Sequence, residues 1–477
     1  MEIHVELNTK SKMFCDSAVS FGAPPNTHVC PVCLGLPGTL PVINEKAVES
    51  TALIGLAVDS RIAQVTQFHR KNYFYPDMPK NYQISQYDRP ICDGGRVVVE
   101  MDDYARTVGI TRVHLEEDTG KLIHIGKGGR IAEADHSIVD FNRAGTPLAE
   151  IVTEPDIRAP REARAFMQKL RSILLHLGVS DCNMEEGSMR CDANVSLRRL
   201  GDTELGTKTE VKNMNSFRAL VRALEYEIGR QFELLENGGR VVQETRHWDA
   251  ARNITTSLRS KEEAHDYRYF ADPDLVPLKL APDWVAALKA GLPELPDARE
   301  ARLMSTFGLP ADDARFMTQS KAHGDYFEAM MGLCDDAKTA ANWMMGELAA
   351  HLNAANCDIS DSPVTPEDLA EMLTLIKDGV ISGKMAKDVF KEMYETGKAA
   401  PGIVETKGLK QISGADEVAA LVDSVLAENP KAVEEYRAGK KQALGFLVGQ
   451  VMALSRGQAN PGLVNEALRA RLPNKAR

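Results

Sequence analysis

The first residues of the chain alternate between apolar and polar side chains with a period of two. Within residues 1–7 every second position is apolar, and the polar positions are Glu2, His4 and Glu6. Such alternation predicts a strand that buries one face, so Glu2 and His4 should project from the same side. A carboxylate and an imidazole on one rigid strand are suitable ligands for a hard metal ion. The alternative is an ordinary solvated strand face.

Apolar residues recur at helical spacing in two longer stretches. Residues 160–177 carry one apolar stripe, which ends at Gly178, and residues 216–235 carry another. Both patterns predict amphipathic helices that pack against a core. The stripe of the second helix includes Phe232 and Leu235, which are therefore expected to be buried.

A second alternating segment lies between these two helices. Residues 190–198 place Asp192 on the polar side, and a further strand candidate follows at 207–211 after a Leu-Gly-Asp turn. The two segments predict an antiparallel hairpin. Strands and helices mixed in this way indicate an α/β or α+β domain with a mixed or antiparallel sheet.

The pattern becomes almost wholly helical after a proline-rich joint near residues 292–296. Residues 358–366 look like a linker, in which Thr365 would cap the next helix. A second joint is expected near 401–408. We therefore expect three domains: 1–290 with the α/β pattern, 291–407 with helices, and 408–477 as a small helical tail.

Composition narrows the class of protein. The chain has 477 residues, is 43% hydrophobic and 26% charged, and contains no apolar run long enough to span a membrane. Its net charge of −11 argues against nucleic-acid binding over the whole surface. Eight cysteines without a visible secretion signal suggest reduced thiols, and hence a cytoplasmic protein.

The C-terminal end differs in charge from the rest. Residues 430–477 hold nine basic and three acidic residues, a net charge of +6. This asymmetry indicates an anionic partner such as RNA, and a solvated basic helix face is the alternative. The candidate contacts are Lys440, Lys441, Arg469 and Arg471.

Cysteine spacing suggests a further metal site. Cys30 and Cys33 form a Cys-x-x-Cys pair, and Cys15 lies upstream. A closed structural zinc site needs four ligands, so Asp16 or His28 would have to complete it. A metal-free remnant of such a site is the alternative.

Two polar segments stand out, the first as a functional loop and the second as either a solvated turn or acids at the end of a strand. Residues 72–89 combine four tyrosines with prolines and charges, which is typical of an ordered loop lining a cleft. Residues 116–118 are three consecutive acids at the end of a strand-like segment. The chain has no Walker-type phosphate loop and no dinucleotide fingerprint, so a bound nucleotide would be held outside the common motifs.

Several blocks, taken in order along the chain, carry a family resemblance. They are EIHVELNTKSKMF, FGAPPNTHVCPVCLGLPGTLPVIN, RKNYFYPDMPKNYQISQYDRPI, HLEEDTGK, DFNRAGTPLAEIVTEPDI, EEGSMRCDANVSLR, TEVKNMNSFRAL and HDYRYFADPDLVPL. Together they closely resemble the B subunit of the aspartyl/glutamyl-tRNA amidotransferases, the GatB family, and the helical remainder is also similar.

The resemblance implies a cradle-shaped catalytic domain that uses ATP and Mg²⁺. It implies phosphorylation of the side-chain carboxylate of glutamate or aspartate mischarged onto tRNA(Gln) or tRNA(Asn). Ammonia would come through a channel from the A (amidase) subunit, in a heterotrimer that also contains a small C subunit. Two other classes remain open: a metal-dependent ligase for another acid, and a non-enzymatic tRNA-binding adaptor.

The resemblance also implies roles for individual residues. The implied magnesium ligands are Glu2, His4, Glu117, Glu150 and Asp192, with Glu116 replacing Glu117 if the register differs by one. Glu117 and Glu150 would also be catalytic, together with Arg190 and Lys212 as phosphate contacts. Lys80 and Tyr82 would bind cofactor or line the cleft or channel. Many relatives have four cysteines at the zinc site, whereas this chain has Ser17 at the position of the second.

Overall fold

We describe the protein from a computed structural model. The described residues are 1–126, 134–260, 266–409, 411–412, 414–455 and 457–472. The chain forms two compact units that meet between Pro296 and Asp297. Each unit is described by itself.

The first unit is built on a ten-stranded sheet in the order β15-β14-β13-β12-β1-β11-β8-β6-β2, with β7 paired to β8. Its neighbouring strands are antiparallel, except that β13 and β14 are parallel, which confirms the expected mixed sheet. The strands are β1 (Glu2–Glu6), β2 (Arg61–Ile62), β6 (Cys92–Asp93), β7 (Arg96–Glu100), β8 (Ala105–Glu117), β11 (Pro147–Thr153), β12 (Met189–Val195), β13 (Thr209–Lys212), β14 (Glu244–Asp249) and β15 (Ile254–Ser260).

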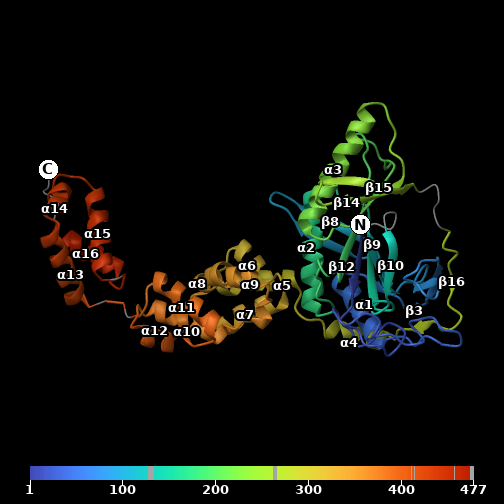
Figure 1. Cartoon of the computed structure of the whole chain (residues 1–477), viewed down its shortest axis with the longest axis horizontal. Helices are drawn as coiled ribbons and strands as arrows, with labels where there is room; N and C mark the ends of the chain where they lie inside the picture. The colour runs from blue at the N-terminus through green and yellow to red at the C-terminus, as the bar shows by residue number, and fades with distance from the viewer. Residues whose placement is uncertain (127–133, 261–265, 410, 413, 456, 473–477) are drawn as a thin grey trace. The chain divides into compact units, whose positions relative to one another are not determined.

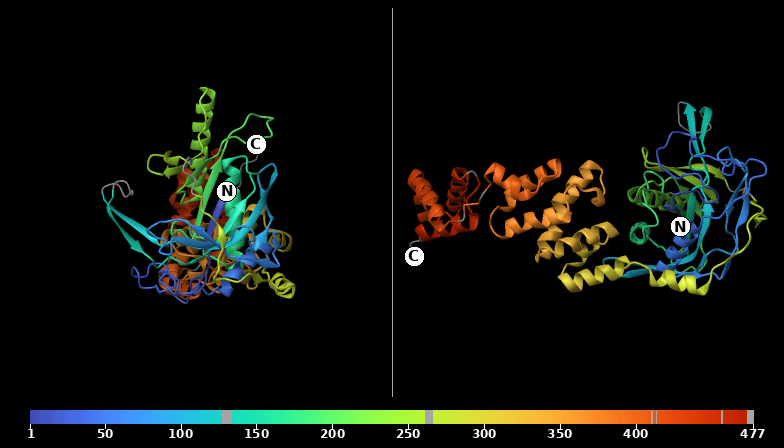
Figure 2. Two further views of the ribbon diagram at one scale, coloured as in Figure 1. Left: turned by 90° about the vertical axis from the view of Figure 1, so that its right-hand side faces the viewer. Right: turned by 90° about the horizontal axis from the view of Figure 1, so that it is seen from below.

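Three smaller sheets accompany it. A three-stranded sheet joins β4 (His69–Asn72), β5 (Tyr82–Ser85) and β16 (Phe270–Ala271). β3 (Val65–Thr66) pairs with β17 (Leu278–Lys279), and β9 (Lys121–Gly126) pairs with β10 (Ala134–Asp140). The β9–β10 ribbon projects away from the main sheet (Figure 2). The three-stranded sheet brings the two tyrosine-rich segments of the sequence together.

Helices cover the apolar face of the main sheet. They are α1 (Glu45–Ala57), α2 (Pro160–Leu177), α3 (Phe217–Glu236) and α4 (Pro282–Ala290). Phe166 and Leu170 of α2 join Ile3 and Val5 of β1 in one hydrophobic core. Gly178 ends α2 in a left-handed conformation with φ 67°, as its position after the apolar stripe predicted. Figure 1 shows α2 on one side of the strands and β16 on the other.

The expected burial is wrong for the last turns of α3. Phe232 and Leu235 are 58% and 42% exposed, because these turns extend past the strands (Figure 1). The polar residues Glu227 and Gln231 are buried instead. Gln231 Nε2 donates to Val195 O at 3.1 Å, which satisfies a carbonyl at the end of β12.

The second unit is helical throughout its described residues. Its first helices are α5 (Pro296–Phe307), α6 (Ala311–Met317), α7 (Lys321–Met331), α8 (Ala337–Trp343), a π-helical turn (Met344–Leu348), α9 (Ala349–Ala355), a 3₁₀ turn (Ile359–Asp361), α10 (Pro366–Lys377), α11 (Gly383–Thr396) and α12 (Ala400–Lys407). A separate hydrophobic cluster holds α13 (Ala415–Glu428), α14 (Pro430–Arg437), α15 (Gln442–Leu454) and α16 (Pro461–Arg471) together.

Two expected connections in this unit are packed structure. Ile359 and Val364 of the supposed linker are 3% and 1% exposed, and they lie in the same core as the helices on both sides. The segment 401–408 is mostly helix α12, whose Ile403 and Val404 belong to that core. The predicted linker and joint are therefore wrong, because the proline and polar residues in these segments mark the starts of helices. Thr365 does cap α10, in a capping box with Asp368. Among the described residues, no helix is long and apolar enough to cross a membrane.

Candidate metal-binding and catalytic site

The polar side of β1 continues across five strands of the sheet. His4 lies opposite Glu150 of β11 and opposite Arg190 of β12, and Glu150 lies opposite His114 of β8. Residues directly opposite each other in a sheet point to the same face. Strand register therefore gathers charged side chains from β8, β11, β1, β12 and β13 on the face that the helices leave open.

The centre of this face holds two histidines and two carboxylates. His4 Nε2 lies 3.5 Å from Glu116 Oε1 and 3.7 Å from Glu150 Oε2. His114 Nε2 lies 3.1 Å from the same Glu150 oxygen. Although burial raises the pKa of Glu150, the attraction of His114 and His4 holds it well below the usual value. Glu150 is therefore an anion at neutral pH, with its charge directed at the histidines.

The structure brings Glu116, rather than Glu117, to this group. One oxygen each from Glu116 and Glu150 and one nitrogen from His4 lie within 4.8 Å of one another. Glu117 points to the other face, where its Oε1 accepts from Ile84 N at 2.8 Å and pairs with Lys80. The expectation of Glu117 as a ligand beside His4 is thus not met. Consecutive residues of a strand point to opposite faces, so a one-residue difference in register exchanges the two environments.

A second carboxylate group lies next to the first. Glu2, Asp192 and Glu210 each place an oxygen within 4.8 Å of the others. Lys212 pairs with Asp192 and lies 3.3 Å from Glu210 Oε1. Burial lowers the pKa of Lys212, but Asp192 and Glu210 together raise it above the usual value. Lys212 is therefore a fixed cation among carboxylates, and its contact with a phosphate stays a prediction.

Arg190 belongs to a third charged group. Its guanidinium pairs with Asp118, and Arg143 Nε lies 3.6 Å from the same carboxylate oxygen. Against the effect of burial, Arg190 and Arg143 lower the pKa of Asp118 to about 2. Burial, and the adjacent Asp118 charge, raise the pKa of Glu6 to about 8. Arg190 is thus ion-paired here, and its predicted contact with a phosphate is untested.

The sequence analysis gave no individual role to His114, Glu210 or Asp118. For two of them a signal was available, because His114, Glu116 and Asp118 alternate at the end of β8 as Glu2 and His4 do along β1. The acids at 116–118 form one cluster in the sequence, but in the structure Glu117 points to the opposite face of the sheet from Glu116 and Asp118.

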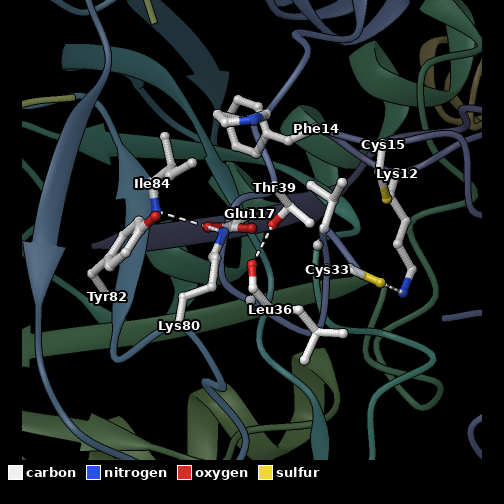
Figure 3. A pocket seen from close by; sticks show the side chains of 14 residues that line it. Lys12, Phe14, Cys15, Cys33, Leu36, Thr39, Lys80, Tyr82, Ile84 and Glu117 are labelled. Atoms are coloured by element: carbon white, nitrogen blue, oxygen red, sulfur yellow. Dashed lines mark hydrogen bonds and ion pairs between the residues drawn. The ribbon is translucent and has the colours of Figure 1, made fainter. Parts of the chain in front are cut away.

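Lys80 and Tyr82 line a different cavity, of about 100 Å³ (Figure 3). Lys80 Nζ lies 5.4 Å from the Tyr82 ring centroid and 5.8 Å from that of Phe14, and it pairs with Glu117. Figure 3 shows Glu117 between Lys80 and the backbone of Ile84. The predicted cleft or channel residues therefore lie together, on the side of β8 away from Glu116.

The three cysteines lie together, and two of them, Cys15 and Cys33, line this cavity. One sulfur each from Cys15, Cys30 and Cys33 lies within 4.8 Å of the others. Lys12, itself buried, places its Nζ 3.5 Å from Cys33 Sγ. A hydrogen bond from the Cys15 thiol, helped by the Cys30 N–H and by Lys12, lowers the pKa of Cys33 to about 4 against the effect of burial.

These residues supply three zinc ligands rather than four. Neither Asp16 nor His28 belongs to the cysteine group, and His28 Nδ1 lies instead 3.0 Å from Ser20 Oγ. Ser17 Oγ lies 3.9 Å from Cys33 Sγ, but a serine hydroxyl cannot supply the thiolate of the missing fourth cysteine. The group does not fit a closed four-ligand zinc site.

The predicted RNA contacts of the tail differ in their surroundings. Lys440, Lys441 and Arg469 are exposed. Lys440 lies 3.3 Å from Glu435 Oε1, whereas Arg471 Nη2 donates to Asp423 Oδ2 at 3.2 Å and is partly covered. Arg471 thus links α16 to α13, and the exposed cations are the better candidates for an RNA contact.

Comparison with known proteins identifies the family. Residues 1–286 match the GatB/GatE catalytic domain, and residues 325–472 match the GatB domain. A protein of Moorella thermoacetica, named as the B subunit of an aspartyl/glutamyl-tRNA(Asn/Gln) amidotransferase, is 58% identical over 473 residues, covering 99% of this chain and 98% of that protein. Proteins of the same name from Geotalea daltonii and Carboxydothermus hydrogenoformans are 54% and 53% identical, with the same coverage. Matched along nearly its whole length, with its charged sheet face inside the matched catalytic domain, the chain belongs to the GatB family.

Proposed function

We propose that this chain is the B subunit of a tRNA-dependent amidotransferase. The reaction begins when the side-chain carboxylate of Glu-tRNA(Gln) or Asp-tRNA(Asn) attacks the terminal phosphorus of ATP, giving an acyl phosphate and ADP. Ammonia then displaces phosphate and forms the amide. Phosphorylation is needed because a carboxylate has no good leaving group, whereas an acyl phosphate has one.

The observation that carries this proposal is the charged sheet face. Two carboxylate groups lie side by side on it, and His4 and Glu2 are two residues apart on the central strand. One group offers two carboxylates and an imidazole and the other three carboxylates, and carboxylate oxygens suit Mg²⁺. His4, Glu116 and Glu150 would hold one ion, and Glu2, Asp192 and Glu210 another. When bound, Mg²⁺ neutralises phosphate charge during phosphoryl transfer.

The cations around these groups have a complementary role. Lys212 at one end and Arg190 at the other are held in place by Asp192 and Asp118. Fixed cations can stabilise the charge that develops on phosphate oxygens, since they need no reorganisation during the reaction. Arg190 lies on β12 and Lys212 on β13, and the pairing of these two strands fixes the positions of both residues.

The separate cavity beside Lys80 and Tyr82 fits a path for ammonia. It lies against Glu117 on β8, while the carboxylate group lies around Glu116. Ammonia would come from the A (amidase) subunit, in a complex that includes the small C subunit. Exposed Lys440, Lys441 and Arg469 would contact the phosphates of mischarged tRNA. We place this activity in the cytoplasm.

The test uses the complex of this chain with the A and C subunits. Wild-type complex should form Gln-tRNA(Gln) or Asn-tRNA(Asn) with ATP and either glutamine or ammonium. Glu150→Gln should lower the rate on the order of a thousandfold with both nitrogen donors. The matched control Glu154→Gln changes an exposed residue just beyond β11 and should keep the activity. Wild-type complex inactive on both tRNAs would refute the proposed function.

A further inference from the structure

A row of aromatic rings runs along the three-stranded sheet. Tyr87 and Tyr269 are stacked, with their ring centroids 4.5 Å apart and planes at 10°. Tyr269 meets Tyr267 edge to face at 6.1 Å, and Tyr267 meets Tyr73 in the same way at 6.1 Å. The row joins Tyr73 and Tyr87 of the loop 72–89 to the segment 266–274, and the proposed chemistry gives none of these tyrosines a role.

Backbone contacts hold the two segments together. β16 pairs with β4, which places Ala271 opposite His69. Asn72 Nδ2 donates to Tyr267 O at 3.2 Å and to Arg268 O at 2.9 Å. The tyrosines are therefore positioned by a small sheet and by side-chain bonds to the backbone. This is a built surface, with its rings held in fixed places.

The row leads to the carboxylate group. Lys71 Nζ lies 5.0 Å from the ring centroid of Tyr267. Ser85 lies opposite His69 in the sheet, and its Oγ donates to Glu116 Oε2 at 3.3 Å. Burial lowers the pKa of Lys71, but Glu116, Tyr269 and Glu150 together raise it above the usual value. His69 also meets the ring of Tyr87 edge to face at 6.3 Å. The aromatic row, including Tyr87, is thus next to the groups assigned to phosphoryl transfer.

Tyr87, the last ring of the row, is open to solvent. Tyr87 remains 54% exposed although one face of its ring rests on Tyr269. Arg89 lies two residues after Tyr87 in the sequence, and Arg268 lies between Tyr267 and Tyr269. Both arginines are exposed. Exposed aromatic rings beside cations form the surface that binds single-stranded nucleic acid, because bases stack on the rings while cations neutralise phosphates.

We infer that the row Tyr87–Tyr269–Tyr267 binds the unpaired 3′ end of the substrate tRNA by base stacking, with a base on the open face of Tyr87. This inference rests on the proposed function, because the aminoacyl group is attached to the 3′-terminal adenosine. Bases held on the row would deliver that group to Glu116 and Glu150.

The alternative source of a stacking base is the adenine of ATP. Two features favour the RNA strand. The row extends over several rings, whereas ATP carries one base. Arg89 and Arg268 are exposed and lie within two residues of Tyr87 and Tyr269 in the sequence, so they are available to backbone phosphates. The phosphates of ATP would instead need cations next to the proposed metal group, and Lys71 lies there.

The test uses the full complex and tRNA(Gln) or tRNA(Asn) that carries 2-aminopurine at the 3′-terminal position. Stacking quenches the fluorescence of this base, so wild-type complex should quench it. Tyr87→Leu should abolish the quenching and raise the apparent KM for the charged tRNA about 5- to 150-fold, the range for loss of one stacked base. The apparent KM for ATP should stay within about twofold.

Two controls separate the ring from the fold. Tyr87→Phe keeps the ring and should keep the quenching, and Phe232→Leu removes an exposed ring on α3 and should change neither constant. An unquenched wild-type complex, or a Tyr87→Leu variant that raises the KM for ATP instead, would overturn the inference. Quenching that depends on Tyr87 in a complex without amidation activity would support the inference and refute the proposed function alone.

Discussion

Glu116 and Glu117 are neighbours in the sequence, yet the structure gives them separate surroundings. Glu116 lies with His4 and Glu150, whereas Glu117 pairs with Lys80 on the opposite face of β8. The variants Glu116→Gln and Glu117→Gln make the same chemical change one residue apart. Each is therefore the matched control for the other.

The two variants should differ in what they lose. Glu116→Gln removes one of three charged or imidazole ligands, and we expect a loss on the order of a thousandfold in ATP-dependent activation, or about 4 kcal/mol. It should cost little stability without metal, because it relieves repulsion between Glu116 and Glu150. Glu117→Gln leaves the Lys80 ammonium without its anion, and both side chains are nearly buried. Removal of one partner of a buried pair costs about 3–5 kcal/mol, and the glutamine can still accept from Ile84 N, so we expect the lower end of that range.

Three measurements separate these effects. Mn²⁺ titration followed by electron paramagnetic resonance reports metal binding, and it should be weakened by Glu116→Gln only. Denaturant unfolding in EDTA should show the larger loss of stability for Glu117→Gln. ADP formation that depends on charged tRNA measures activation in the complex. Loss of Mn²⁺ binding in Glu117→Gln, with normal binding in Glu116→Gln, would refute the assignment by strand face.

The other charged groups give three further predictions. The pKa of Glu6 is about 8 in the folded protein, above its ordinary value, so the folded state keeps a proton that the unfolded chain loses, and the free energy of unfolding should fall as pH rises between the two values. Glu6→Gln should remove that part of the slope in denaturant unfolding from pH 5 to pH 8, and an unchanged slope would show that Glu6 is ionised in the folded state. Elemental analysis of protein purified without added metal should give well below one zinc per chain, because the cysteine group has three ligands, whereas a full equivalent would reveal a fourth. Replacing both Lys440 and Lys441 with alanine should weaken tRNA binding and reduce the slope of log K against log salt by up to about 2, and an unchanged slope would mean that these lysines form only a solvated face.

Local patterns determined much of this protein. The alternation in residues 1–7 set the strand and the shared face of Glu2 and His4, and the apolar stripe before Gly178 set α2 with its end. These predictions succeeded because side-chain direction in a strand or helix depends on nearby residues alone. Family motifs marked Glu150 and Asp192 as candidate ligands, and their role in metal binding stays a prediction.

Only the tertiary structure decided which charges meet. Glu116 and Glu117 are equivalent by composition, and the pairing of β8 with β11 settled which of them faces His4. Burial of Ile359 and Val364 turned an apparent linker into core, since packing against helices far along the chain overrides local polarity. The aromatic row needs residues near 70, 87 and 269, which come together only when β16 pairs with β4. The sequence specifies local direction, while contacts between distant segments depend on the free energy of the whole fold.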